Sequence, residues 1–208
     1  MNVTFSLDRA AGVLCDASGR RFDPGTRTWH AATGAAPAIA GGDRVDAIAA
    51  ARWLQRDSGH PLRVPVGVIG PREATPAQLA AAEAVGTGLA TMGFALICGG
   101  RQGVMEAVCK GATGAGGIAI GLLPDADPAL ANPYVGVIVA TGIGEARNAL
   151  ITRAALCLVA IGDSFGTLSE VAFGRQFGKL VVGLEGAARV DGVRHVAGVD
   201  AALAAVAL

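Results

Sequence analysis

The sequence has no excess of charge of either sign. Lysine and arginine together number 17, aspartate and glutamate number 17, and the 208-residue chain has no formal net charge. It also contains no basic block. Because a protein that binds nucleic acid needs positive charge to displace the counterions of the phosphate backbone, we expect no nucleic acid among its partners. A neutral chain near its isoelectric point tends instead to self-associate.

Cysteine pairs, clustered histidines and long apolar runs are lacking as well. The four cysteines form no CxxC pair and the three histidines lack metal-ligand spacing, so we expect no metal site, and we predict no bound cofactor. Such cysteines are typical of reduced core thiols in a cytoplasmic protein. Asp8 and Arg9 interrupt the start of the chain, and no apolar run is long enough to cross a bilayer. We therefore predict neither a signal peptide nor membrane association.

The first 63 residues differ from the rest of a chain that is otherwise typical of a compact globular protein. The segments "VTFSL", "GVLCD", "GRRFD" and "TRTWH" predict short strands, and "AATGAAPAIAGG" is typical of a loose linker. A helix is predicted over "DRVDAIAAARWLQRDSG", with Asp43 as N-cap and Gly59 as stop. Its predicted apolar face consists of Val45, Ile48, Ala49 and Trp53. We interpret residues 1–63 as an extension, a small ribbon plus a helix, without recognisable chemistry.

From residue 64 onward, apolar segments alternate regularly with helical ones. The predicted strands are "VPVGVIG", "FALICGG", "GIAIGLLP", "VGVIVATG", "LCLVAIG" and "LVVGLEG". The clearest helix has Thr75 as cap, Pro76 at its first position and Gly93 as stop. Nearly continuous apolar strands separated by helices indicate an α/β fold over residues 64–208, a Rossmann-like doubly wound parallel sheet with helices on both faces. Ligands in such folds bind beyond the carboxyl ends of the strands, near the switch point.

Glycines and charged residues gather where four of these strands end. The four ends read "IGPRE", "CGGRQGVME", "TGIGEARN" and "IGDSFGTLSE". Gly99, Gly100 and Gly103 lack a Cβ, so backbone N–H groups could approach a ligand closely, and the following helix points its free N–H groups at the same place. The ends of the second and fifth predicted strands, "CGGRQGVME" and "IGDSFGTLSE", resemble each other, which predicts two similar turns side by side that hold one phosphorylated ligand. Tight packing of a helix on the sheet also selects glycine and is the alternative for either turn.

Arg147 and Glu170 are the candidates for chemistry. The planar fork of Arg147 could reach a phosphate or a leaving group, and the alternative is a solvated surface arginine. Glu170 lies one turn inside a helix predicted to begin at Thr167, where it could bind sugar hydroxyls or orient a water. The alternative is a capping box, in which Glu170 bonds back to the backbone of Thr167. Asp163 places an anion where a ligand anion would bind, so this turn is a working phosphate site, an altered one, or only a helix cap.

Five motifs in the same order resemble the LOG family of lysine-decarboxylase-like proteins, over about residues 66–185. They are "CGGRQGVMEAVCKGA", "GLLP", "ANPYV", "GEARN" and "GTLSE", and the branch they resemble includes molybdenum-cofactor carrier proteins. The resemblance implies a Rossmann-like fold, a homodimer or homotetramer, and a nucleotide-type ligand at the strand ends. Characterised LOG enzymes are phosphoribohydrolases, which cleave the N-glycosidic bond of nucleoside 5′-monophosphates.

The family signature PGGxGTxxE, with a preceding arginine, is matched only in part. Gly166, Thr167 and Glu170 match the end of the signature, and Arg147 falls at the arginine. The departures are Gly162 in place of the proline, Asp163 and Ser164 in place of two glycines, and Asn148 in place of a lysine. An aspartate close to a phosphate repels it, more strongly as water is excluded.

Two functions follow from these residues. In the first, an enzyme cleaves the glycosidic bond: Glu170 stabilises the oxocarbenium-like charge and Arg147 assists departure of the base. In the second, a non-catalytic protein binds or carries the molybdenum cofactor or a signalling nucleotide. The predicted ligand-binding residues are Gly70, Pro71, Gly99, Gly100, Arg101, Gly103, Val104, Met105, Thr141, Asn148, Ser164, Gly166 and Thr167.

Two further activities are set aside. DNA binding conflicts with the zero net charge. Lysine decarboxylation would need a lysine placed for a pyridoxal Schiff base, and the chain's only lysines, Lys110 and Lys179, lie along or just after predicted helices.

Overall fold

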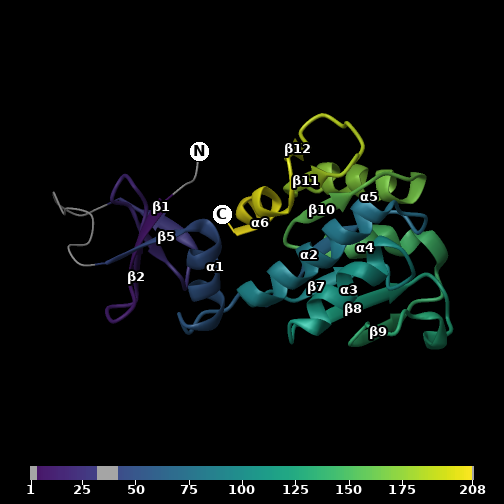
Figure 1. Ribbon diagram of the computed structural model, residues 1–208, viewed down its shortest axis with the longest axis horizontal. Helices are drawn as coiled ribbons and strands as arrows, with labels where there is room; N and C mark the ends of the chain where they lie inside the picture. Colours follow the sequence, from purple (N-terminus) through teal and green to yellow (C-terminus); the bar gives the residue numbers. More distant parts are fainter. Residues whose placement is uncertain (1–3, 32–41, 208) are drawn as a thin grey trace. The chain divides into compact units, whose positions relative to one another are not determined.

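The computed structural model describes residues 4–31 and 42–207 of the chain (Figure 1). Its internal contacts divide them into two compact units, one within residues 1–62 and the other spanning Arg63–Val206. The linker predicted from "AATGAAPAIAGG" falls almost wholly outside the described residues. No helix in the described ranges combines the length and the apolar character needed to cross a membrane.

The first unit is a small antiparallel sheet with one helix. Its five strands lie in the order β4-β3-β2-β1-β5. They are β1 (Thr4–Asp8), β2 (Val13–Cys15), β3 (Arg21–Asp23), β4 (Thr28–His30) and β5 (Asp43–Asp46), followed by α1 (Ala47–Arg56). The aromatic rings of Phe5 and Trp29 stack at a centroid distance of 5.9 Å, and Phe22 lies 5.0 Å from the same indole.

The start of α1 differs from the prediction. Asp43 begins β5, and the N-cap is Asp46, whose carboxylate accepts a hydrogen bond from the backbone N–H of Ala49 at 2.8 Å. Val45 is therefore extended and pairs with Phe5 in the sheet. The helix begins later than predicted, so the buried face shifts to Ala47, Ala50, Ala51, Trp53 and Leu54. It also ends at Arg56, before Gly59.

The second unit is a seven-stranded parallel sheet flanked by helices, so the predicted α/β fold is confirmed (Figure 1). Its strands are β6 (Val66–Ile69), β7 (Leu96–Cys98), β8 (Ala119–Leu123), β9 (Val137–Ala140), β10 (Leu158–Ile161), β11 (Val181–Leu184) and β12 (Arg194–His195). Its helices are α2 (Pro76–Met92), α3 (Val104–Gly114), η1 (Pro128–Leu130), η2 (Gly144–Ala146), α4 (Arg147–Ala154), α5 (Phe165–Gln176) and α6 (Val199–Ala207). Six strands were predicted. The seventh strand, β12, consists of only two residues, and both are exposed. No apolar run in the sequence therefore predicts it.

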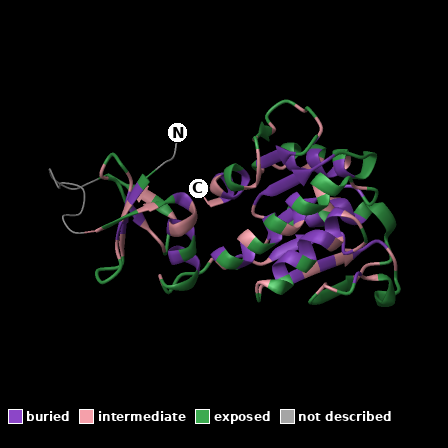
Figure 2. Ribbon diagram, viewed as in Figure 1, coloured by how far each residue is buried: buried purple, intermediate pink, exposed green. Residues whose placement is uncertain are grey.

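The strand order β12-β11-β10-β6-β7-β8-β9 places the switch point between β6 and β10. The chain moves outward from β6 to β9, returns to the other side of β6, and moves outward again. Because parallel crossovers are right-handed, this reversal places helices on both faces of the sheet. Every residue of β6, β10 and β11 is buried (Figure 2). At the sheet edge, by contrast, Val137, Ile138 and Val139 of β9 are exposed, and β8 is the one strand that pairs with β9 in this sheet.

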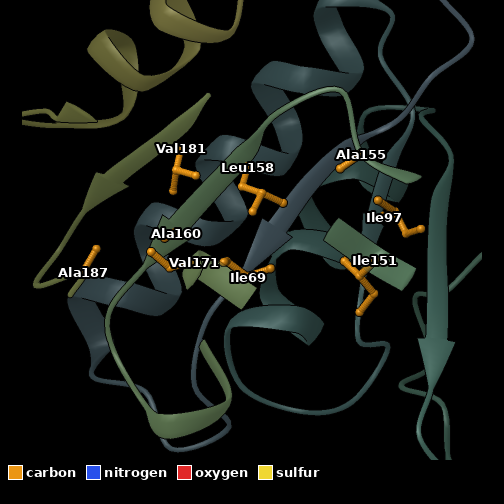
Figure 3. Close-up of a cluster of buried hydrophobic side chains, with 9 residues drawn as sticks. All are labelled: Ile69, Ile97, Ile151, Ala155, Leu158, Ala160, Val171, Val181 and Ala187. Carbon is orange, nitrogen blue, oxygen red and sulfur yellow. The ribbon is translucent and has the colours of Figure 1, made fainter. Parts of the chain in front are cut away.

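One core cluster fixes α4 and α5, the helices that come before and after β10 in the chain. Ile151 of α4 and Val171 of α5 pack with Ile69, Leu158 and Val181 of the central strands (Figure 3). All five side chains are at most 1% exposed. The cluster therefore holds α4 and α5 against the sheet by residues that lie one turn or less from Arg147 and Glu170.

Helix α2 forms as predicted. The Thr75 hydroxyl accepts from the backbone N–H of Gln78 at 3.3 Å, and the Gln78 side chain accepts from the N–H of Thr75 at 3.0 Å. Pro76 occupies the first position, and Gly93 ends the helix at a φ of 97°. That left-handed conformation strains residues with a Cβ, so glycine suits this position.

Glycines also let α2 and α3 pack closely. A Cβ on Gly86 would overlap the carbonyl oxygen of Val108, and a Cβ on Gly111 would overlap the carbonyl oxygen of Glu83. The hydroxyl of Thr87 donates to the carbonyl of Gly111 at 3.3 Å across this interface. The two backbones therefore come nearer than side chains would allow.

We expect Gly111→Ala to destabilise the protein by about 1–3 kcal/mol, because the added methyl meets backbone that has no room to move. Gly114→Ala in the same helix is the matched control. It has no heavy atom within 4 Å of the added Cβ, and alanine is the better helix former, so its stability should be unchanged or higher. Urea unfolding measures both, and equal stability of the two variants would contradict close packing of α2 on α3.

Candidate functional site

A pocket of about 560 Å³ lies at the carboxyl ends of the central strands, where the switch point leads us to expect a ligand site. Its volume is in the range of small-molecule sites. The wall comes from the ends of β6, β7 and β10 and from the starts of α3, α4 and α5. It is lined by Ile69, Gly70, Pro71, Arg72, Glu73, Gly99, Met105, Glu145, Arg147, Asn148, Asp163, Ser164, Gly166, Thr167 and Glu170.

Two glycines make room for this wall. A Cβ on Gly70 would lie 2.5 Å from Cγ1 of Val104 and 2.6 Å from the carbonyl oxygen of Ile161. A Cβ on Gly99 would lie 2.5 Å from Nη2 of Arg147 and 2.7 Å from Sδ of Met105. Gly99 thus provides space for a guanidinium, in addition to any space it leaves for a ligand.

Arg147 is a buried cation. It begins α4, and only 5% of its side chain is exposed, so the alternative of a solvated surface arginine is wrong. Its Nη1 donates a hydrogen bond to Oδ1 of Asn148. The same nitrogen lies 3.8 Å from a carboxylate oxygen of Glu145 and 3.8 Å from one of Glu170. Its buried Nε has no hydrogen-bond partner among the described residues.

Asn148 holds this arginine in place. Its Oδ1 accepts from Arg147, and its Nδ2 donates to Oγ of Ser169 at 2.9 Å. Ser169 donates in turn to the carbonyl of Gly166 at 2.7 Å. We therefore interpret Asn148, which was predicted to bind ligand, as the residue that ties α4 to α5 and positions the Arg147 guanidinium.

The cap of α5 is Ser164, so the predicted helix start and the capping box are both wrong. The Ser164 hydroxyl accepts from the backbone N–H of Thr167 at 3.1 Å, and the helix begins at Phe165. The sequence favoured Thr167 as cap because threonine followed three residues later by glutamate is the usual signature. Serine precedes it at the strand end, however, and takes the role. Glu170 lies further inside the helix and has no capping function.

Burial of Glu170 opposes its ionisation. Only 8% of its side chain is exposed. Burial is the largest influence and raises the pKa of Glu170, Arg147 lowers this pKa, and Glu145 raises it. The resulting pKa is about 8, above the ordinary 4.5. Glu170 is thus mostly protonated at neutral pH. Asp163, by contrast, is exposed at the rim of the pocket.

Ten of the fifteen predicted site residues line this pocket. They are Gly70, Pro71, Gly99, Met105, Arg147, Asn148, Ser164, Gly166, Thr167 and Glu170. Their roles toward a ligand stay predictions. Five others do not line it: Gly100, Arg101, Gly103, Val104 and Thr141.

The residues outside the pocket pack against the protein instead. A Cβ on Gly100 would lie 3.0 Å from Leu123, and a Cβ on Gly103 would overlap the carbonyl oxygen of Arg72. Arg101 pairs with Asp125 at 2.8 Å, the hydroxyl of Thr141 donates to the carbonyl of Leu123 at 2.7 Å, and Val104 is fully buried. Most residues of the glycine-rich turn after β7 therefore agree with the alternative given above, in which glycine is present because the helix packs tightly on the sheet.

The two turns are also not side by side, because β6 lies between β7 and β10 in the sheet. The prediction rested on similar motifs, whereas strand order is decided by the crossovers. The loop after β6 accordingly supplies residues that the prediction omitted. The pocket-lining residues absent from the predicted set are Ile69, Arg72, Glu73, Glu145 and Asp163. Four of the five are charged, and each lies just beyond a predicted strand end or in "GEARN". Charge at these positions is the sequence feature that could have identified them.

Comparisons with known proteins agree with this geometry. The model of the SLOG cluster4 family matches residues 63–204. An uncharacterized protein of Archaeoglobus fulgidus is 37% identical over 129 residues, which are 62% of this chain and 85% of that protein. They confirm the resemblance that the five motifs indicated.

Two solved structures are each similar to about 70% of the chain. The molybdenum cofactor binding protein of Rippkaea orientalis is 32% identical, with a TM-score of 0.65 over 70% of this chain and 96% of that one. The molybdenum cofactor carrier protein of Chlamydomonas reinhardtii is 36% identical, with a TM-score of 0.64 over 69% of this chain and 96% of that one.

We expect Glu170→Gln to become more stable relative to wild type as pH rises from 5 to 8. The folded pKa of Glu170, about 8, is above its ordinary value of 4.5. Its contribution to stability is therefore fully present below pH 4.5 and is lost as pH rises toward 8, by at most about 1.4 kcal/mol per pH unit. Glutamine does not ionise and loses nothing.

Denaturant unfolding at several pH values measures this difference. Glu73→Gln removes an exposed carboxylate from the same pocket, and its difference from wild type should stay flat. A flat difference for Glu170→Gln as well would show that Glu170 is ionised in the folded protein throughout this range.

Proposed function

The chain belongs to the SLOG cluster4 family, and from that premise we propose that its pocket binds a phosphorylated small molecule as a non-catalytic binding or carrier protein. The ligand class we favour is a phosphorylated pterin of the molybdenum-cofactor type. One observation carries the proposal: a buried arginine with an unpartnered Nε lines a pocket of about 560 Å³ at the switch point. An isolated buried cation is costly, and an anionic ligand would offset that cost.

Two further observations support the pterin class. The two similar solved proteins are described as binding or carrying the molybdenum cofactor. The pocket wall also combines apolar surface, from Ile69, Pro71 and Met105, with polar groups at the start of α5. A flat heterocycle with one phosphate needs both kinds of surface.

Binding without turnover is favoured by the state of Glu170. A phosphoribohydrolase needs negative charge near the oxocarbenium-like transition state, and burial keeps Glu170 mostly protonated at neutral pH. Asp163 and Ser164 also replace the two glycines of the hydrolase signature, so the loop before α5 carries a carboxylate that would repel a phosphate bound there.

Nucleoside 5′-monophosphate hydrolysis is the second candidate, and one observation favours it. Glu170 and Arg147 both line the pocket and lie 3.8 Å apart. A carboxylic acid with a pKa of about 8 is suited to donate a proton to a departing base at neutral pH. This candidate uses the same pocket and differs only in whether the ligand is turned over.

We expect Arg147→Lys to weaken binding of a phosphorylated pterin, and of AMP as a second probe, by about tenfold or more. A lysine keeps the charge but loses the two-pronged hydrogen bonds, each worth about 1.5–3 kcal/mol when charged. Arg153→Lys is the matched control on the same helix. Arg153 lies 3.7 Å over the ring of Phe177 and does not line the pocket, so its affinity should equal that of wild type.

Isothermal titration with product analysis tests both candidates. Lack of binding by wild-type protein, or equal affinity of Arg147→Lys and wild type, would refute the proposed site. Release of free base from AMP that Glu170→Gln abolishes would establish the hydrolase instead.

We also propose that the protein self-associates as a homodimer or homotetramer. Phe165 at the start of α5 is 93% exposed, and Leu150 of α4 and Leu168 of α5 are 47% and 37% exposed. Large apolar side chains exposed to this degree are characteristic of interaction surfaces. Phe165→Asp should lower the mass found by sedimentation equilibrium, and a monomeric wild type would contradict the proposal.

A further inference from the structure

Four charged side chains of alternating sign follow one another through the pocket. Arg72 Nη2 lies 4.0 Å from Oε1 of Glu145, Oε2 of Glu145 lies 3.8 Å from Nη1 of Arg147, and that nitrogen lies 3.8 Å from Oε1 of Glu170. The first two side chains are 48% and 67% exposed, and the last two are 5% and 8% exposed. The series therefore runs from the solvent-exposed rim to the buried floor.

Glu145 lies between two arginines and presents one carboxylate oxygen to each. Arginine pairs bind phosphate monoesters and carboxylates in this way, because each guanidinium offers several donors to a planar or tetrahedral anion. Both Glu145 distances exceed hydrogen-bond length. A carboxylate this exposed and this loosely held contributes little to stability, so an entering anion can displace it.

Arg147 has few other sources of compensating charge. Its Nη1 is bonded to the neutral amide of Asn148, and its Nε is without a partner in the described part of the chain. Glu170 is its nearest buried carboxyl group, and burial opposes the ionisation of Glu170. Exposed Glu145 is then the main counterion of a guanidinium that is almost fully removed from water.

The other position where an anion could bind is the first turn of α5, and binding there is less favourable. The hydroxyl of Ser164 already accepts from the N–H of Thr167. Asp163, the residue before this cap, also lines the pocket. A second negative charge there would meet electrostatic repulsion, whereas two cations face the position of the Glu145 carboxylate.

We propose that the phosphate group of the ligand binds between Arg72 and Arg147, in the position of the Glu145 carboxylate, and that Glu145 moves into solvent as the ligand enters. This inference rests on the proposed function and locates its anionic subsite. Glu145 is then a built-in competitor for the ligand phosphate. A competitor of this kind weakens affinity and speeds release, which suits a protein that must give its ligand to another.

The test is isothermal titration with AMP and with inorganic phosphate, using variants that each remove one negative charge. We expect Glu145→Gln to raise affinity for both probes by about tenfold, equal to about 1.4 kcal/mol. Asp163→Asn should give a clearly smaller gain. Glu83→Gln, whose carboxylate pairs with Lys110 outside this pocket, is the control for net charge and should bind as wild type does.

Arg72→Gln should lower affinity several-fold, and in the Glu145→Gln/Arg72→Gln double variant most of the gain should be lost, because both substitutions act on one position. A gain from Asp163→Asn equal to or larger than that from Glu145→Gln would overturn the inference and place the phosphate at α5. Unchanged or weaker binding by Glu145→Gln would overturn it too. Absence of binding in wild type and in every variant would instead refute the proposed function, and the inference with it.

Discussion

The buried guanidinium of Arg147 sets the requirements that the rest of the site meets. A cation with 5% of its side chain exposed needs space, orientation and negative charge, and residues around it supply all three. Gly99 at the end of β7 leaves the space, Asn148 bonded to Ser169 gives the orientation, and Glu145 supplies loosely held charge. Glu145 and Asn148 flank Arg147 in the segment after β9, whereas Gly99 follows β7 and Ser169 lies on α5 after β10, so the order of strands in the sheet is needed to bring all of them together.

The weak ion pairs of the site suit binding better than covalent chemistry. Both contacts of Glu145 are close to 4 Å, and the pKa of Glu170 is about 8, so little negative charge is firmly held next to Arg147. A catalytic centre requires charges held in place before the reaction. A carrier instead requires an arrangement that a ligand can enter and leave, and contacts as loose as those of Glu145 support the proposal of binding without turnover.

The Asp163-Ser164 pair illustrates how a family signature can change its use. In the sequence, an aspartate in a phosphate-binding turn is a contradiction. In the structure, Ser164 caps α5 and Asp163 is exposed at the rim, so the turn serves the helix. Arg72 and Arg147 lie in another part of the pocket wall, and it is between them that we propose the ligand phosphate binds.

The sequence by itself determined the fold class, the family and the boundaries of α2. Apolar strands buried on both faces, the cap at Thr75 and the stop at Gly93 depend on local patterns, and five short motifs identified the family. The sequence pattern placed the N-caps of α1 and α5 at Asp43 and Thr167, whereas the structure has them at Asp46 and Ser164. Several residues near each helix start are able to cap it, and only the neighbouring strands decide which residue takes that role. Only the tertiary structure decided that Arg147 is buried, that β6 separates the two glycine-bearing turns, and that Arg72 and Glu145 join the pocket. Those facts depend on strand order and on loops distant in sequence, and the crossovers of the chain, not its local composition, bring these loops to one edge of the sheet.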